Sequence, residues 1–275
     1  MRPAQPGPPR PGTAPGVTVR DADSIIRVDR LTKRYDGALP ALVDVSFSID
    51  PGEFVAVLGP SGAGKTTLFR CLTGLTRPDS GSVIVRSHDI YGIRGRALRA
   101  ARHEIALIFQ QFNLVRRLTA HQNVLAGRLA TVSTWRVFLR RFAKPDRQRA
   151  LACLDAVGLL DRAYARADEL SGGQQQRVAI ARALAQEATV ILADEPVASL
   201  DPESASVVLQ TLHAVARTGV AVVASLHQVH LATSYADRII ALRAGRIVED
   251  APADHIDAQA LEQMYARDTQ VESPG

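Results

Sequence analysis

A glycine-rich loop that ends in a lysine and two hydroxyls is the stretch of this sequence best equipped for chemistry. Its residues, 59–67 in the chain, are Gly59, Pro60, Ser61, Gly62, Ala63, Gly64, Lys65, Thr66 and Thr67. Glycines let the backbone curl so that successive N–H groups point at one anion, and a helix beginning here adds the positive end of its dipole. Lys65 supplies a charge for the β- and γ-phosphates, and the Thr66 hydroxyl suits Mg²⁺. The pattern predicts a nucleoside triphosphate site.

The flanks of the loop support that prediction. An apolar run, residues 54–58, has the composition of a buried strand, and residues 68–72 have helical spacing. A strand, a glycine loop and a helix in this order are the context in which such a motif binds phosphate. The plain alternative, a flexible glycine turn, leaves Lys65 and Thr66 unexplained.

An acidic pair, Asp194 and Glu195, follows the four apolar residues 190–193. An acid at the C-terminal end of a core strand faces the ligand crevice of an α/β sheet. Asp194 suits Mg²⁺, through water, and Glu195 suits polarising a water aimed at the γ-phosphate. Apolar strands often end in acids, so the pair becomes informative only in combination with residues 59–67.

The second informative stretch of the sequence is residues 170–177, Leu-Ser-Gly-Gly-Gln-Gln-Gln-Arg. Ser171 is a natural N-cap, and a periodic helix runs from Gln174 through Ala185. Two glycines at a capped helix start make an anion site. One nucleotide should not need two such sites in one chain, and an ordinary helix cap would not require Ser-Gly-Gly-Gln.

The elements that must position these residues are predicted to alternate between strands and helices. Before residue 96 we expect mainly antiparallel strands feeding a parallel core, at residues 25–28, 42–49, 54–58 and 81–85. A strand at 105–109 is followed by helices at 120–129, 135–142 and 145–157. The later part returns to α/β alternation, with strands at 190–193 and 220–224, a helix at 205–216 and a hairpin at 238–242 and 246–248. We therefore predict a mixed β core with an antiparallel β subdomain and an inserted α-helical subdomain.

The domain prediction divides the 275 residues into three parts. Residues 1–23 form a disordered proline-rich tail, because this stretch cannot bury enough apolar surface to offset its ordering entropy. Residues 24–251 form the nucleotide-binding domain, with the helical subdomain inserted at about 96–168. Residues 252–275 form a C-terminal extension, too short for a regulatory domain.

Composition excludes several classes and leaves others open. The chain has no run of 18 apolar residues and no apolar signal segment, so we expect neither a membrane span nor secretion. Cys71 and Cys153 have no metal-like spacing and are expected to be core thiols in a reducing cytoplasm. A net charge of +5 is too mild to identify a partner. A basic cluster within residues 136–149 is a solvated helix face or faces an anionic surface, and few aromatics interleave it as nucleic-acid binding would require. Its members are Arg136, Arg140, Arg141, Lys144, Arg147 and Arg149.

With these motifs in hand, the chain resembles an ABC-type ATPase, the nucleotide-binding subunit of an ATP-binding cassette transporter. Leu170–Gln174 matches the signature motif of that family letter for letter. The other family motifs appear in order: Gln110 in the Q-loop, residues 199–201 as the D-loop, and His227 as the switch histidine. Tyr35 matches the aromatic that stacks on adenine. The resemblance covers roughly residues 25–250.

The resemblance implies roles for these residues. Two subunits pair head to tail, and each ATP lies between one P-loop and the signature of the partner, so that Ser171, Gly172, Gly173 and Gln174 contact the γ-phosphate held by the other subunit. Glu195 is then the general base, and His227 holds the γ-phosphate and the attacking water in line. His227 alone could equally be an ordinary polar histidine at a strand end. Gln110 senses the γ-phosphate and touches Mg²⁺. Asp201 contributes to the nucleotide site or simply caps a helix before Pro202.

At the level of the subfamily the chain is similar to phosphonate-importer ATPases. The similarity lies in five segments: 127–129, 133–135, 166–169, 195–199 and 226–229. Ala251, where many relatives have glycine, and the proline-rich tail depart from the pattern. The implied partners are a second copy, integral-membrane permease subunits and, indirectly, a periplasmic or extracellular solute-binding protein, with no nucleic acid. The implied place is the cytoplasmic face of the inner membrane. Phosphite, phosphate or another small solute, an exporter, and a soluble ABC ATPase acting on DNA or ribosomes remain alternatives.

Overall fold

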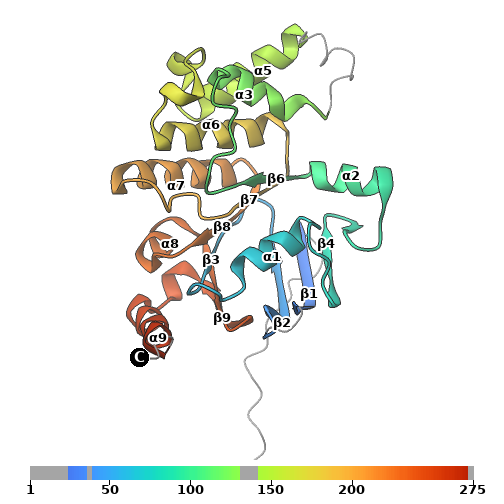
Figure 1. Cartoon of the computed structure of the whole chain (residues 1–275), viewed down its shortest axis with the longest axis vertical. Coiled ribbons are helices and arrows are strands. Elements are labelled where there is room, and N and C mark those ends of the chain that lie inside the picture. Colours follow the sequence, from blue (N-terminus) through green and yellow to red (C-terminus); the bar gives the residue numbers. More distant parts are fainter. Residues whose placement is uncertain (1–23, 36–38, 131–141, 272–275) are drawn as a thin grey trace, which may run out of the picture.

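A six-stranded, mostly parallel sheet forms the centre of the protein (Figure 1). The computed structural model describes residues 24–35, 39–130 and 142–271. The strand order in this sheet is β10-β9-β3-β8-β7-β6. The strands are β3 (Phe54–Leu58), β6 (Ile105–Ile108), β7 (Val190–Ala193), β8 (Ala221–Leu226), β9 (Arg238–Arg243) and β10 (Arg246–Pro252).

The central strands are buried on both faces. Every residue of β3, β7 and β8 is buried, which is why these segments read as continuous apolar runs instead of alternating patterns. β3, β6, β7, β8 and β9 run parallel, and β10 pairs antiparallel with β9 as the predicted hairpin. The C-terminal ends of the parallel strands consequently share one edge of the sheet.

A second, antiparallel sheet has the strand order β2-β1-β4-β5. Its strands are β1 (Ile26–Lys33), β2 (Leu42–Ile49), β4 (Ser80–Val85) and β5 (His88–Asp89). The inward side chains of β1, β2 and β4 join the same hydrophobic cluster as Val55 and Val57 of β3. The two sheets thus enclose α1 (Lys65–Leu72), whose apolar residues belong to that cluster.

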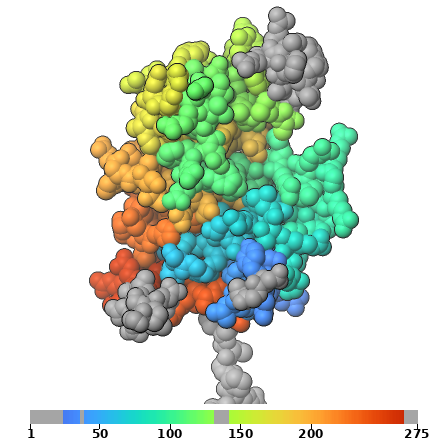
Figure 2. Space-filling model, viewed as in Figure 1, coloured from blue at the N-terminus to red at the C-terminus, as the bar shows by residue number. Residues whose placement is uncertain are grey.

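The remaining helices form two groups. In Figure 1 the upper layer holds α3 (Ala120–Leu125), α5 (Lys144–Ala156) and α6 (Gly172–Ala185), with α7 (Pro202–Ala216) directly beneath α6. The same layer is the uppermost block of the surface in Figure 2, coloured green to yellow. Elsewhere lie α2 (Gly95–His103), α8 (Val229–Tyr235) and α9 (Ala258–Val271). Short 3₁₀ turns complete the chain: η1 (Ala126–Arg128), η2 (Leu160–Arg162), η3 (Ala167–Glu169) and η4 (Ala253–His255).

Arg128 ties the upper layer together. Its guanidinium contacts the carboxylates of Asp146, at the start of α5, and of Glu187, after α6, and donates to the Ala185 carbonyl. The side chains of Arg128 and Asp146 are mostly shielded from solvent. Because partly buried ion pairs with additional hydrogen bonds resist separation, η1, α5 and the end of α6 are held as one unit.

The predicted fold class is confirmed: a mixed β core, an antiparallel sheet and a helical layer are all present. Some elements differ from the sequence prediction. The first strand extends to Lys33, beyond the predicted end at Val28. The prediction stopped short because register shifts, with Arg30 at φ 44°, break the alternation of buried and exposed side chains there. Helix α2 was not predicted, since only Leu98 and Ala101 of its residues pack on the core. Helices α8 and α9 were also missed.

Several predictions concern segments outside the described residues or boundaries that no observation tests. The tail at 1–23, most of the helix at 135–142, and Arg136, Arg140 and Arg141 of the basic cluster lie outside the described residues. The helical range of about 96–168 contains β6, which belongs to the central sheet. The two cysteines are confirmed as free and buried.

Candidate active site

Four neighbouring parallel strands deliver the predicted site residues to one edge of the sheet. β3 leads into residues 59–67, β8 into His227, β7 into Asp194 and Glu195, and β6 into Gln110. The register places Leu58 opposite Leu226, and Ala193 opposite both Ala224 and Ile108. Since ligands bind beyond the carboxyl ends of parallel strands, this edge is the candidate active site.

Residues 59–67 form the tight loop that their glycines predicted. Gly59 has a φ of 156° and Gly64 a φ of 106°, and a Cβ at either position would lie within 2.5 Å of a backbone carbonyl, of Leu242 or of Ala41. Only glycine fits there. Helix α1 begins at Lys65 without a side-chain cap, so its first N–H groups are available to an anion.

Lys65 lies over its own loop. Its Nζ donates to the Gly59 carbonyl at 2.5 Å and to the Pro60 carbonyl at 3.1 Å, and the side chain is buried. Burial lowers the pKa of the ammonium, while the carboxylates of Glu195 and Asp194 act in the opposite direction. The charges of these two carboxylates thus act on Lys65 at the same edge of the sheet.

Ser225 joins the two acidic residues and was missed by the sequence analysis. This residue of β8 is fully buried; its Oγ donates to Asp194 Oδ1 at 2.8 Å and accepts from the Glu195 N–H at 2.8 Å. The available signal was a single hydroxyl in an otherwise apolar strand, two residues before His227. Ser225 leaves Asp194 with its other oxygen for a ligand.

We expect Ser225→Ala to lower kcat for ATP hydrolysis about tenfold with little change in KM. The substitution leaves an Asp194 oxygen and the Glu195 N–H without partners and so loosens both side chains, which costs about 1–3 kcal/mol for an unpaired buried group. Steady-state kinetics and a thermal melt measure the effect. Ser206→Ala is the matched control, because that hydroxyl bonds only within α7. An unchanged kcat in Ser225→Ala would contradict the role.

Glu195 and His227 contact each other. His227 Nε2 lies 2.6 Å from Glu195 Oε1, and Glu195 has a φ of 51°, in the left-handed region that non-glycine residues rarely occupy. The Ser225 hydroxyl on the Glu195 N–H supports this backbone conformation. A cleft opens beside the pair, lined by Glu195, Val197, Ala198, Ser225, Leu226, His227, Gln228 and Leu231. The paired carboxylate and imidazole can orient and deprotonate a water.

The serine–glycine segment lies apart from this edge, at the start of α6. Ser171 caps the helix reciprocally with Gln174: its Oγ accepts from the Gln174 N–H at 3.3 Å, and Gln174 Oε1 accepts from the Ser171 N–H at 3.0 Å. The glycines also serve packing, because a Cβ at Gly173 would lie 2.9 Å from the Cβ of Ser204 in α7. Within the described residues, no hydrogen bond or ion pair joins residues 170–174 to residues 59–67.

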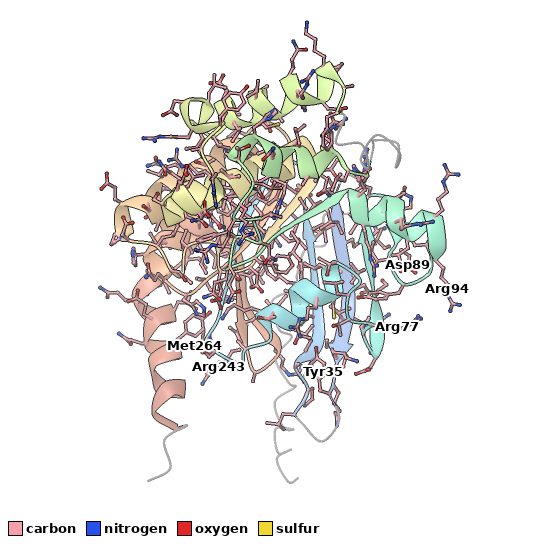
Figure 3. The ribbon with its side chains drawn as sticks, turned by 45° about the horizontal axis from the view of Figure 1, so that its top comes forward. Tyr35, Arg77, Asp89, Arg94, Arg243 and Met264 are labelled. Atoms are coloured by element: carbon pink, nitrogen blue, oxygen red, sulfur yellow. The ribbon has the colours of Figure 1, made fainter. Side chains whose placement is uncertain are left out.

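The other predicted residues lie where strand ends and turns place them. Tyr35 is exposed at the end of the antiparallel strands, with the Lys33 ammonium 5.5 Å from its ring centre (Figure 3). Thr66 and Gln110 are exposed at the site edge. Asp201 caps α7 by accepting from the Ser204 N–H at 2.9 Å, and this hydrogen bond lowers the pKa of its carboxyl. The helix-cap contact of Asp201 is thus present, and its contribution to a nucleotide site stays a prediction.

Comparison with known families decides what this edge belongs to. The model of the ABC transporter family matches residues 42–198, more than half of the chain. The chain belongs to the ABC transporter family. It is accordingly an ATP-binding cassette that hydrolyses ATP, as the resemblance predicted. In the part of this cassette that the structure describes, no helix is both long and apolar enough to cross a membrane.

Curated relatives resemble the cassette over most of its length. A protein of Stutzerimonas stutzeri named hypophosphite import ATP-binding protein HtxD is 50% identical over 248 residues, 89% of this chain and 72% of that protein. Two proteins named phosphonates import ATP-binding protein PhnC follow. That of Thiobacillus denitrificans is 48% identical over 89% of this chain and 94% of its own length. That of Lactococcus lactis subsp. lactis is 42% identical over 89% of this chain and 100% of its own length.

Solved structures share the fold of the cassette. The ATP-binding cassette MJ0796, solved as a dimer in a post-hydrolysis state bound to ADP and Pi, has a TM-score of 0.71 and 34% identity, covering 83% of this chain and 98% of that one. The structure of cbiO1 from Clostridium perfringens, described as part of the ABC transporter complex cbiONQ, has a TM-score of 0.75 and 26% identity, covering 92% of this chain and 97% of its own.

Proposed function

We propose that the chain is the ATP-hydrolysing subunit of a bacterial importer for phosphonates. The observation that carries the proposal is the identity of 42–48% to proteins named phosphonates import ATP-binding proteins, over nearly their full length. The solute itself would be contacted by other subunits, so the residues of the active site do not determine which solute is transported.

We further propose that two copies complete the site. Residues 59–67 and residues 170–174 are separate in one chain, yet both are built to hold an anion. A head-to-tail pair would place Ser171, Gly172 and Gly173 of one copy against the γ-phosphate bound to the loop of the other. The similar cassette solved as a dimer with ADP and Pi supports this arrangement. ATP would then favour the closed pair, since only in that state does it contact both residues 59–67 of one copy and residues 170–174 of the other.

Roles in hydrolysis follow from the geometry of the sheet edge. Glu195 is the general base that takes a proton from the attacking water, and His227 orients the carboxylate through the 2.6 Å contact and holds the γ-phosphate in line. Lys65 leaves the carbonyls of Gly59 and Pro60 and turns to the β- and γ-phosphates. Tyr35 stacks on adenine, and Asp201 adds to the nucleotide site from the turn before α7.

The residues at the edge fit a magnesium ion. Asp194 keeps one carboxylate oxygen free of Ser225, the Thr66 hydroxyl is exposed, and Gln110 follows the neighbouring strand. Among the described residues no group of three or more His, Cys, Asp or Glu side chains could hold a metal. Mg²⁺ suits such a sparse donor set, because it binds through one or two protein oxygens, water and substrate phosphates, where it neutralises developing charge.

Partners and domain limits are part of the same proposal. The cassette would drive integral-membrane permease subunits from the cytoplasmic face of the inner membrane, and a solute-binding protein would deliver the solute on the other side. The nucleotide-binding domain would span residues 24–251, with the helical subdomain inserted. Residues 252–275 would then form an extension that starts at the last residue of β10 and contains η4 and α9.

A second candidate solute has an observation of its own. The relative named for hypophosphite import is 50% identical, slightly above the phosphonate relatives. Both names describe small phosphorus oxyanions, so this class of solute is common to the two candidates.

Growth of a strain lacking this chain, on single phosphorus sources that must be taken up, tests the proposal. We expect loss of growth on methylphosphonate as the sole phosphorus source, restored by the wild-type chain and not by Glu195→Gln. Growth on hypophosphite is measured in parallel. If only hypophosphite uptake is lost, the second candidate is correct; if neither is lost, both solute assignments are wrong.

A further inference from the structure

The loop that carries Gln110 is fastened to helix α6 by one half-buried guanidinium, that of Arg182. Arg182, in the last turn of α6, donates from Nη1 to the Asn113 carbonyl at 2.6 Å and from Nη2 to the Phe112 carbonyl at 3.4 Å. No ion pair in the described part of the chain involves Arg182. Burial alone lowers the pKa of its guanidinium. A half-buried charge without a carboxylate partner is stabilised by the hydrogen bonds that it donates, here to two carbonyls of one loop.

The backbone that Arg182 holds is strained. Phe112 has a φ of 53° and Asn113 a φ of 48°, two successive non-glycine residues in the left-handed region. Asparagine adopts this region readily, but for phenylalanine it is unfavourable and persists only where the surroundings impose it. The guanidinium on both carbonyls is such a constraint.

The same loop also lies close to the other end of α6. A Cβ at Gly172 would lie 3.7 Å from the ring Cζ of Phe112. The carbonyl of Phe112 thus accepts a hydrogen bond from Arg182, in the last turn of the helix. The ring of Phe112 lies near the first turn of the same helix, beside Ser171. The loop after β6 and the helix that begins with the serine–glycine segment are braced at two points.

We propose that Arg182 is a positioning residue: through the carbonyls of Phe112 and Asn113 it makes the Gln110 loop and helix α6 move as one body. A ligand at the sheet edge that shifts Gln110 would then reorient Ser171 for the partner subunit. The inference rests on the proposed ATP-bound pair of subunits. It adds the residue by which an event at Gln110 reaches residues 170–174.

Arg177 provides a matched control on the same helix. Its Nη1 donates to the Val157 carbonyl at 3.0 Å and to the Gly158 carbonyl at 3.4 Å, and burial lowers the pKa of its guanidinium as well. Arg177 therefore has the same chemistry as Arg182 but binds the α5 end of the helical layer instead of the Gln110 loop.

The experiment compares Arg182→Gln and Arg177→Gln, each in the Glu195→Gln background, as full-length chains. ATP titration followed by size-exclusion chromatography with light scattering reports dimer formation, and a fluorescent ATP analogue reports binding to the single subunit. We expect Arg182→Gln to require roughly tenfold more ATP for dimerisation, the size of effect seen for residues that transmit coupling, with unchanged affinity for the analogue. Arg177→Gln should dimerise like its parent.

Two further measurements keep the outcomes decisive. Arg182→Lys retains the charge with a single donor atom and should be intermediate at an unchanged melting temperature, which covers the case in which Arg182→Gln folds poorly. In the wild-type background, Gln110→Ala and Arg182→Gln should be non-additive in their effect on ATPase rate, because they interrupt one connection. Equal dimerisation of the Arg182 and Arg177 variants, or additive effects with Gln110→Ala, would overturn the inference. If Glu195→Gln alone fails to dimerise with ATP, the proposed pairing itself is wrong.

Discussion

Replacing Glu195 with glutamine is expected to reduce ATP turnover by about 10³-fold while leaving ATP binding intact. General bases contribute roughly 10²–10⁴-fold to a rate, and glutamine keeps the shape of the side chain without its basicity. The contact with His227 Nε2 at 2.6 Å survives, since the amide oxygen of glutamine can still accept. Phosphate release under saturating ATP measures the loss.

The same variant should accumulate as a dimer with ATP, because the step that would reopen the pair is blocked. Light scattering with ATP and with ADP distinguishes the two states, ADP serving as the control that leaves subunits separate. A Glu195→Gln chain that stays monomeric at saturating ATP would contradict the sandwich arrangement. Retention of near wild-type turnover would exclude Glu195 as the base.

Substituting Ser171 by arginine is the second change with a large expected effect, a loss of ATPase activity of about 10²-fold or more. Arginine at the first position before α6 removes the capping hydroxyl and fills the space at Gly172 and Gly173 where the partner's phosphate would lie. Loss of the cap alone costs only about 1 kcal/mol, so a loss of that size requires the phosphate contact.

Binding of ATP by the single subunit should remain as in the wild type, because Ser171 has no hydrogen bond to residues 59–67. Ser171→Ala is the control: it removes the cap without adding bulk and should lose far less activity. The proposal that this serine acts across the interface would be falsified if the affinity of the isolated Ser171→Arg subunit for ATP fell in step with its activity.

Patterns that depend on one segment predicted the structure well. Residues 54–58 and 190–193 are strands at the predicted bounds, because a wholly buried strand leaves a continuous apolar run in the sequence. Residues 42–49 also form a strand at the predicted bounds, which the alternation of apolar and polar residues had indicated. The loop at 59–67 was predictable because Gly59 and Gly64 lie so close to Leu242 and Ala41 that no other residue fits at these two positions.

Features that depend on two distant segments were out of reach. Ser225 acts on Asp194 and Glu195 only because β8 lies beside β7, and an isolated serine in an apolar strand carries no sign of that. The strained pair Phe112 and Asn113 needs Arg182, which lies about seventy positions later. The motifs indicated which residues form the candidate active site. The residues that hold them in position, such as Ser225 and Arg182, are brought there by tertiary packing and could not be predicted from the sequence.

The way Lys65 rests on the Gly59 and Pro60 carbonyls has a consequence for the exchange of nucleotide. An ammonium that already has partners must give up two carbonyl hydrogen bonds when it turns to phosphate, and this loss offsets part of the stronger, charge-assisted interaction that it gains. The affinity of the loop for ATP is thereby held below what its charge alone would give. After hydrolysis the same carbonyls can take the lysine back, which eases the departure of ADP. A transporter that must cycle many times is served better by such a reversible grip than by a tight one.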